Sequence, residues 1–274
     1  MVQDFSVLMS VYIGESASNI EECFESLLNQ TISANEWVIV EDGPLKGEVY
    51  EVLDRFEREY EGLIKRIRLE NNQGLGIALR EGIAKCSNEI VARMDTDDIA
   101  VNNRFEKQLN EFKNNPKLDI CGGFIDEFID NPNEIVARRT VPITMNEIEK
   151  YQKRRDAFNH MTVMFKKSAV LKAGNYQPCP LMEDTYLWVR MIQTGAVCMN
   201  IPEPLVLARV GKEMFKRRGG LEYYKKYREG RSMVKDTGFI GTFDYCYTLL
   251  IQLIVSIMPN GIRGLIFKKV LHRK

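Results

Sequence analysis

The chain has 274 residues, 38 basic and 38 acidic side chains, and a hydrophobic fraction of 45%. These values are ordinary for a globular protein and allow one large domain with an appendage. Two histidines are too few for a histidine-rich zinc site, and the six scattered cysteines form no CxxC pair. No secretory signal is recognised before Phe5, so we expect reduced, mostly buried thiols in a cytosolic protein.

The zero net charge hides an asymmetry along the chain. Residues 212–274 contain 14 Lys and Arg against 5 Asp and Glu, a balance of +9, so residues 1–211 carry −9. An acidic body with a basic C-terminal part indicates contact with an anionic surface. Phospholipid and nucleic acid are the two candidate surfaces.

Short apolar runs alternate with helical patterns in the first part of the chain. The runs predict buried strands at residues 5–10, 37–40, 64–69 and 89–94. The segments between them have the spacing of amphipathic helices, at residues 20–29, 49–56 and 77–85. This alternation predicts a parallel sheet that is covered by helices on both faces.

Open parallel sheets bind ligands beyond the carboxyl ends of their strands. The polar turns at these ends should therefore gather on one edge of the sheet; they are residues 10–12, 41–43, 71–76 and 95–98. The glycines in the third turn are weak evidence for phosphate binding by themselves. The sequence lacks the GxGxxG and GxxxxGKS/T patterns, which disfavours dinucleotide binding and P-loop chemistry.

The most informative turn is Asp95-Thr96-Asp97-Asp98, which follows the fourth predicted strand directly. Three carboxylates in four residues repel one another and are not buried without a cationic partner. The expected partner is Mg²⁺ or Mn²⁺, which joins protein carboxylates to a phosphate-bearing ligand. The alternative is a solvated turn in which an aspartate caps the next helix.

The pattern becomes mixed beyond Pro116. Strands are predicted at residues 120–129, 134–141 and 160–165. Glu183 and Asp184 then open an amphipathic helix that stops at Gly195. Helix capping alone would account for this acidic pair, because the helix dipole favours acids in the first turn.

The C-terminal segment is apolar and basic. Residues 243–258 are mostly apolar, but a helix that spans a membrane needs ~20 such residues. After a break at 259–261, apolar and basic residues alternate over 262–274, which is typical of a helix in a lipid interface. We expect peripheral membrane association, and a helical hairpin packed on the body is the alternative.

The chain resembles bacterial family 2 glycosyltransferases of the GT-A fold, specifically those that build O-antigen and capsule repeat units. The likeness runs from Ser6 to about Gly220 and depends on the order and spacing of several short motifs. These are Ser6-Val-Leu-Met-Ser-Val-Tyr12, Val40-Glu-Asp-Gly43, Asn72-Gln-Gly-Leu-Gly76, Arg93-Met-Asp-Thr-Asp-Asp98, Asn159-His-Met-Thr-Val-Met-Phe165, Met182-Glu-Asp184 and Arg209-Val-Gly211. Met161 departs from the family, in which proline is common at this position.

The resemblance implies an α/β architecture with a Rossmann-like nucleotide-binding, mixed but mostly parallel sheet flanked by helices. The GT-A domain would cover residues 1–219, with a nucleotide-binding half at about 1–115 and an acceptor-binding half at about 116–219. Residues 220–274 would form a basic, amphipathic, helical extension that associates with the membrane.

The resemblance also implies roles for individual residues. Asp95 and Asp97 form the DxD motif, with Asp97 as the direct ligand of Mn²⁺ or Mg²⁺. Asp184 is implied to be the general base, with Glu183 beside it, and Asp42 to accept the uracil N3–H. The residues implied to bind the nucleotide-sugar are Ser10, Tyr12, Asp42, Asn72, Gly74, Arg80, Asp95, Asp98, His160 and Arg209.

Two of these roles have equal alternatives. His160 stands before an apolar segment, where a histidine is as often structural. Arg209, like Arg217 and Arg218, would either neutralise a diphosphate or belong to a solvated basic face.

These roles describe an inverting, metal-dependent transfer of a hexose, galactose or glucose, from a UDP-sugar. The acceptor would be a polyprenyl-diphosphate-linked saccharide of a surface polysaccharide, and the product a β-glycoside. The protein would be peripheral at the cytoplasmic face of the bacterial inner membrane, without a nucleic-acid partner. A sugar nucleotidyltransferase is one alternative, although residues 10–14 lack a basic, glycine-rich loop. A non-catalytic protein that binds nucleotide-sugars in an assembly complex is the other.

Overall fold

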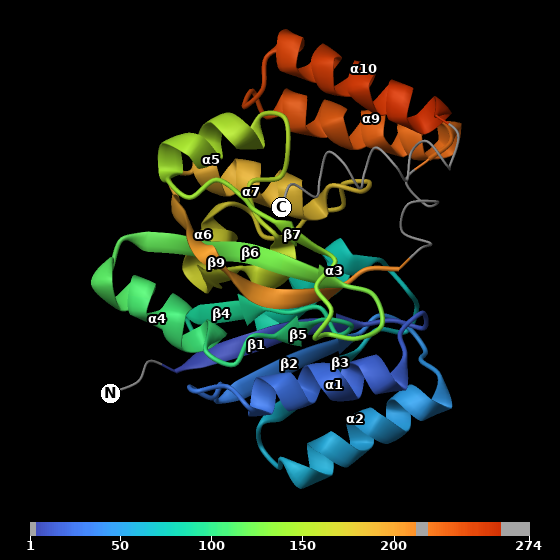
Figure 1. The fold of residues 1–274 in the computed structure, drawn as a ribbon, viewed down its shortest axis with the longest axis vertical. Coiled ribbons are helices and arrows are strands. Elements are labelled where there is room, and N and C mark those ends of the chain that lie inside the picture. The colour runs from blue at the N-terminus through green and yellow to red at the C-terminus, as the bar shows by residue number, and fades with distance from the viewer. Residues whose placement is uncertain (1–3, 212–218, 259–274) are drawn as a thin grey trace.

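The structure is a computed structural model that describes residues 4–211 and 219–258. The first part of the chain forms four parallel strands joined by helices (Figure 1). The strands are β1 (Phe5–Val11), β2 (Glu36–Glu41), β3 (Ile64–Arg68) and β4 (Ile90–Arg93). The helices are α1 (Ala17–Leu28), α2 (Gly47–Glu59) and α3 (Leu75–Lys85). The alternation predicted from the sequence is confirmed.

The second part adds strands of both directions to the same sheet. They are β5 (Ile99–Ala100), β6 (Leu118–Phe128), β7 (Ala137–Arg139), β8 (Met164–Lys166) and β9 (Val197–Arg209). The helices here are α4 (Arg104–Asn114), α5 (Met145–Gln152), α6 (Lys167–Lys172) and α7 (Glu183–Gln193). The sheet has the order β3-β2-β1-β4-β8-β6-β9-β5, with β7 paired to β6. The expected mixed sheet flanked by helices is therefore present.

The predicted strand at 160–165 is wrong over its first half. His160–Thr162 forms a 3₁₀ turn, and only β8 continues as a strand. The Thr162 hydroxyl donates to the Asn159 carbonyl over 2.7 Å and accepts the Gly123 amide over 3.0 Å. These side-chain bonds offer the backbone an alternative to sheet pairing, and the turn aims His160 at the sheet edge.

Two elements that position the site have no clear sequence signal, α4 and β9. Pro202 and Pro204 interrupt the strand pattern of β9, and its pairing with β6 shifts register twice between Gly123 and Ile125. Prolines in a sheet are confined to such irregular places because they cannot donate a ladder bond.

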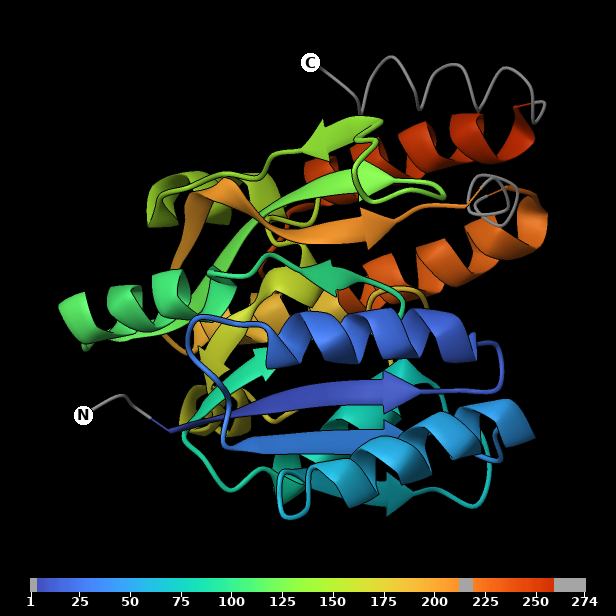
Figure 2. The same cartoon turned by 60° about the horizontal axis from the view of Figure 1, so that its bottom comes forward.

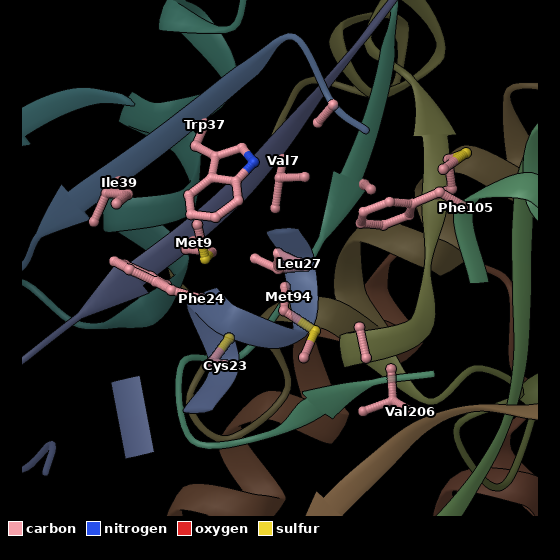
Figure 3. Close-up of a cluster of buried hydrophobic side chains, with 14 of the residues drawn as sticks. Val7, Met9, Cys23, Phe24, Leu27, Trp37, Ile39, Met94, Phe105 and Val206 are labelled. Carbon is pink, nitrogen blue, oxygen red and sulfur yellow. The ribbon is translucent and has the colours of Figure 1, made fainter. Parts of the chain in front are cut away.

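The sheet has a hydrophobic core on each face, because successive side chains of a strand point to opposite sides. Val7 and Met9 of β1 lie in the cluster against α1, together with Phe24 and Trp37 (Figure 3). Leu8 belongs to the other cluster, which α3 and α7 cover. Burial on both faces explains why the strands read as continuous apolar runs.

A glycine lets α3 approach the sheet closely. A Cβ at Gly82 would lie 2.3 Å from the Leu8 Cδ1 atom and 2.9 Å from the Val40 Cγ2 atom. Both distances are below van der Waals contact, so this position admits only a residue without a side chain unless the core shifts.

The chain continues into a helical hairpin of α9 (Leu221–Asp236) and α10 (Thr242–Ile257), which lies at the top of Figure 1. Val234 and Ile240 attach the hairpin to Val189 of α7 through a small buried cluster. None of the helices in the described ranges is long and apolar enough to cross a membrane. The predicted amphipathic segment 262–274 lies outside the described residues, as do Arg217 and Arg218.

Candidate active site

The carboxyl ends of the parallel strands meet at one edge of the sheet, as expected. The arrowheads of β1 and β2, both blue, point to the same side in Figure 2. The 95–98 turn lies at this edge because the Met94 amide donates to the Leu8 carbonyl of β1 over 3.0 Å. One carboxylate oxygen from each of Asp95, Asp97 and Asp98 lies within 4.8 Å of the other two. The predicted clustering of these three acids is confirmed.

The electrostatics of this cluster favour a bound cation. Burial raises the pKa of Asp98 well above its ordinary value, and the charges of Asp97 and Asp95 add to that. Burial and the Asp95 charge also raise the pKa of Asp97. Burial acts in the same direction on Asp95, but Arg93 and His160 outweigh it and lower the pKa of Asp95. Oxygen ligands that are disfavoured as free anions fit a hard divalent ion, Mn²⁺ or Mg²⁺.

A fourth carboxylate, Glu15, belongs to the same edge and has no motif that would single it out. It lies in the turn after β1, where its amide donates to the Tyr12 carbonyl over 3.1 Å. Burial, Asp97 and Asp95 raise the pKa of Glu15 to about 7. The position of Glu15 just after the first strand is the only signal that could have indicated it.

Arg93 of β4 supplies a buried positive charge to the cluster. Its side chain is 1% exposed, and its Nη1 atom lies 2.5 Å from Asp95 Oδ2. Burial alone would lower the pKa of Arg93, but Asp95 and Asp184 raise it, so the guanidinium remains charged. The Arg93 side chain was not predicted to have a role, since it falls within an apparently apolar strand.

His160 connects the carboxylate cluster to the start of α7. Its Nε2 lies 3.0 Å from Asp95 Oδ2, and its Nδ1 lies 3.3 Å from Asp184 Oδ2. Burial and Arg93 oppose protonation of the ring, but Asp184 and Asp95 prevail and raise the pKa of His160. An imidazolium between two carboxylates satisfies both ring nitrogens, which fixes the ring at this edge.

Asp184 and Glu183 occupy the first turn of α7, as predicted. The Tyr176 hydroxyl donates to Asp184 Oδ1 over 3.2 Å, a contact that the sequence did not indicate. Burial and the charge of Asp184 raise the pKa of Glu183. The start of α3 can approach this turn because a Cβ at Gly76 would lie 3.0 Å from the Glu183 Cβ atom.

A second predicted group lies at the ends of β2 and β3. Asp42 is 3% exposed, and its two carboxylate oxygens accept the amides of Gln73 and Gly74 over 2.7 and 3.0 Å. The Asn72 side chain donates to the Asp42 carbonyl over 3.2 Å. Asp42 therefore holds the 72–76 loop against β2, and its contact with a base stays a prediction.

A cavity of about 520 Å³ contains the catalytic candidates. Of the predicted site residues, those that line it are Asp95, Asp97, Asp98, His160, Glu183, Asp184 and Arg209. Those outside its lining are Ser10, Tyr12, Asp42, Asn72, Gly74 and Arg80. The guanidinium of Arg80 pairs instead with Glu81 over 3.2 Å. The residues around the carboxylate cluster and Asp184 thus surround the cavity. The residues around Asp42 lie at the ends of strands in the same sheet but outside the cavity lining.

Arg209 is bound by protein groups on several sides. Its amide donates to Asp98 Oδ1 over 2.8 Å, and its Nε donates to the Asp97 carbonyl over 3.1 Å. The guanidinium also pairs with Glu22 and stacks 4.6 Å above the Phe128 ring. The structure therefore gives Arg209 a supporting role for the acidic turn, in addition to its place in the cavity lining.

Sequence comparison finds close relatives of this chain. The model of glycosyl transferase family 2 matches residues 6–171. An uncharacterized glycosyltransferase of Haemophilus influenzae is 40% identical over 98% of this chain and 99% of its own length. The Escherichia coli UDP-Gal:alpha-D-GlcNAc-diphosphoundecaprenol beta-1,3-galactosyltransferase is 35% identical over 98% of this chain and 97% of its own length.

Comparison with solved structures agrees on the fold. The mannosyltransferase PcManGT of Pyrobaculum calidifontis, solved with GDP-Man and Mn²⁺, matches 94% of this chain and 71% of its own chain. The TM-score is 0.64 at 14% sequence identity. This likeness shows the GT-A-like mixed sheet of these enzymes and leaves donor and metal to be argued from the site.

Proposed function

Because this chain belongs to glycosyl transferase family 2, we propose that it is an inverting, metal-dependent hexosyltransferase. The donor is a UDP-sugar, and the acceptor is a saccharide linked to polyprenyl diphosphate in surface-polysaccharide synthesis. One observation carries the proposal: the cluster of three carboxylates and the carboxylate of Asp184 line the same cavity, and the imidazole of His160 joins Asp95 of the cluster to Asp184.

Galactose is the first choice of sugar. It is the sugar named for the Escherichia coli relative, whose named acceptor carries N-acetylglucosamine on diphosphoundecaprenol. That relative matches nearly the full length of this chain, so the acceptor half is included in the likeness. Glucose is the second choice, since a pocket distinguishes similar hexoses by only a few kcal/mol.

Asp97 and Asp95, with Asp98 beside them, would hold Mn²⁺ or Mg²⁺. When bound, such an ion stabilises the negative charge that develops on the departing diphosphate. The chain's own contribution is the turn that brings these carboxylates together and the buried Arg93 that keeps Asp95 ionised.

Asp184 acts as the general base. An acceptor hydroxyl is too weakly acidic to attack unaided, so a carboxylate must accept its proton in the transition state. The Tyr176 hydroxyl and the His160 ring hold the two oxygens of Asp184 and orient it toward the cavity. A single displacement inverts the anomeric carbon, so an α-linked donor yields a β-glycoside.

We also propose that the protein associates with the cytoplasmic membrane surface through α10. Six large apolar side chains of this helix are 44–71% exposed; they are Phe243, Tyr247, Leu250, Ile251, Ile254 and Ile257. Their spacing places them along one face of the helix. A lipid surface would cover this face, and the basic residues 225, 226 and 228 of α9 suit anionic headgroups.

The decisive test is a screen of UDP-sugars with and without Mn²⁺ or Mg²⁺. We expect metal-stimulated hydrolysis of UDP-galactose and transfer to an N-acetylglucosaminyl-diphosphate lipid. Release of pyrophosphate from UTP and a sugar phosphate would instead identify a nucleotidyltransferase. Binding of a UDP-sugar without hydrolysis or transfer would identify a non-catalytic protein.

A further inference from the structure

The cavity is lined by four arginines in addition to the carboxylate cluster. They come from β7, from the segment after α5 and from α9, and they are Arg139, Arg154, Arg155 and Arg231. None of them belongs to a motif of the family resemblance. The cavity therefore joins acids of the sheet edge to arginines that come from other elements, one of them in the helical hairpin; these arginines are called the basic end below.

Arg231 is a buried cation in the wall of the cavity. Its side chain is 2% exposed, and burial lowers its pKa. The Nε atom donates to Thr248 Oγ1 over 3.2 Å, and Nη2 donates to the Lys153 carbonyl over 2.7 Å. These neutral acceptors position the guanidinium. Asp156 and Asp244 act on its charge, but neither forms an ion pair with it, and a buried charge without a direct ion pair is costly.

Arg155 lines the same cavity and also forms no ion pair with a described residue. Its guanidinium stacks 5.6 Å above the Tyr151 ring, and the side chain is exposed. Within residues 4–211 and 219–258, no ion pair joins Arg155 or Arg231 to a carboxylate. Asp156 lines the same end, and its carboxylate accepts a hydrogen bond from Thr185. The basic end thus has cations to spare for an anionic ligand.

Arg154 marks the path from this end to the apolar face of α10. It pairs with Asp244 over 2.6 Å and lies 5.5 and 5.0 Å from the ring centres of Phe243 and Tyr247. Both rings belong to the exposed apolar face of α10. A ligand with an anionic head in the cavity and an apolar tail could follow this path.

We infer that the arginine-lined end, centred on Arg155 and Arg231, binds the diphosphate of the prenyl-linked acceptor. This inference rests on the proposed function. The donor diphosphate belongs at the carboxylate cluster, so the arginines are left for a second anion. A sugar whose diphosphate lies at the arginines would extend toward Asp184, which lines the same cavity. Guanidinium groups suit this ligand because they bind phosphate oxygens in a bidentate manner.

The test uses the full chain and farnesyl diphosphate, a short prenyl diphosphate without a sugar, in EDTA. EDTA removes metal-assisted binding at the carboxylates. Calorimetry should show binding of farnesyl diphosphate, with weaker binding of farnesyl monophosphate and inorganic pyrophosphate. Arg155→Ala should weaken the binding of farnesyl diphosphate by about tenfold or more, since charge-assisted hydrogen bonds to the diphosphate are lost. Arg58→Ala is the matched control, because Arg58 is an exposed arginine of α2 outside the cavity lining.

Arg231→Lys is a second variant, which keeps the positive charge but removes the two-pronged guanidinium. Its melting temperature is measured alongside to show that the variant is folded. Failure of the unmodified chain to bind farnesyl diphosphate would overturn the inference. Unchanged affinity in Arg155→Ala would do the same, and equal affinity for inorganic pyrophosphate would reject a prenyl ligand. Metal-stimulated hydrolysis of UDP-galactose needs no acceptor. If the unmodified chain does not hydrolyse UDP-galactose, the proposed function is contradicted, and the binding of farnesyl diphosphate in EDTA can still be measured independently.

Discussion

Asp95 and Asp184, which come from different halves of the chain, are bridged by the imidazole of His160. The two contacts are 3.0 Å and 3.3 Å long and use the two ring nitrogens. One side chain therefore contacts carboxylates of two separate elements. The acidic turn and the first turn of α7 are thus linked in this site.

Replacement of His160 by alanine should break this link. Transfer should fall by roughly 100-fold, because a base that is misplaced by about 1 Å loses that much activity. Binding of UDP should be less affected than turnover, and the comparison of kcat with UDP affinity measures this. His160→Gln, which can bond to both neighbours, should recover part of the rate. Equal activity of His160→Ala and the unmodified enzyme would contradict the bridge.

The substitution Asp184→Asn tests the assigned base. It keeps the size and the hydrogen bond from Tyr176 but removes the proton acceptor. Transfer should fall by ~10²–10⁴-fold, the usual contribution of general base catalysis. Binding of UDP, measured by calorimetry with Mn²⁺, should persist. A fully active variant would show that another group accepts the proton.

The crowded acids predict how stability depends on pH when no metal is added. Glu15 has its pKa raised from 4.5 to about 7, so the folded state retains a proton that the unfolded state has lost between these values. Stability in EDTA should therefore fall as the pH rises from about 4.5 to about 7. Glu15→Gln should flatten this slope and raise stability at pH 8 by at most ~3 kcal/mol, less where solvent screens the charge.

Urea unfolding over this pH range, in EDTA, measures the effect. Glu48→Gln is the control, because Glu48 lies on α2, and its substitution should leave the slope unchanged. A slope of the opposite sign in the unmodified protein would refute the crowding of acids at this edge.

Gly82→Ala tests the close contact of α3 with the sheet. The added methyl would lie 2.3 Å from Leu8 Cδ1, and such overpacking costs typically 1–3 kcal/mol. The melting temperature should therefore fall. Gly47→Ala on α2 is the matched control, since nothing lies within 4 Å of the added atom. If both variants melt alike, the α3 contact is looser than described.

The apolar face of α10 predicts membrane binding. Replacing Leu250 and Ile254, which are 57% and 45% exposed, by glutamate should weaken binding to anionic liposomes by roughly tenfold or more. Hydrolysis of UDP-galactose in solution should be retained, because neither residue lines the cavity. Co-sedimentation with liposomes measures the membrane binding. If the variant sediments with liposomes as well as the unmodified protein does, α10 is not the face that contacts the membrane.

Local sequence signals were sufficient for several parts of this protein. The alternation of apolar runs and amphipathic segments predicted the parallel strands and their helices, because each face of this sheet is buried. The acidic turn was evident because it follows the apolar strand β4 directly, and the acidic pair because it opens the amphipathic helix α7. The 3₁₀ turn at His160 was not evident, because one of the bonds that stabilise it joins Thr162 to Gly123, 39 residues away in the chain.

The sequence by itself determined that Asp95, Asp97 and Asp98 gather at the sheet edge, since parallel strands place their ends on one side. Tertiary structure alone decided that His160 touches both Asp95 and Asp184 and that Arg231 lies in the same cavity. Those relationships join elements that meet only after the sheet, α7 and the α9–α10 hairpin have packed. The distances between these side chains depend on which groups are buried and on the angles at which the helices pack on the sheet. No local pattern of residues encodes either.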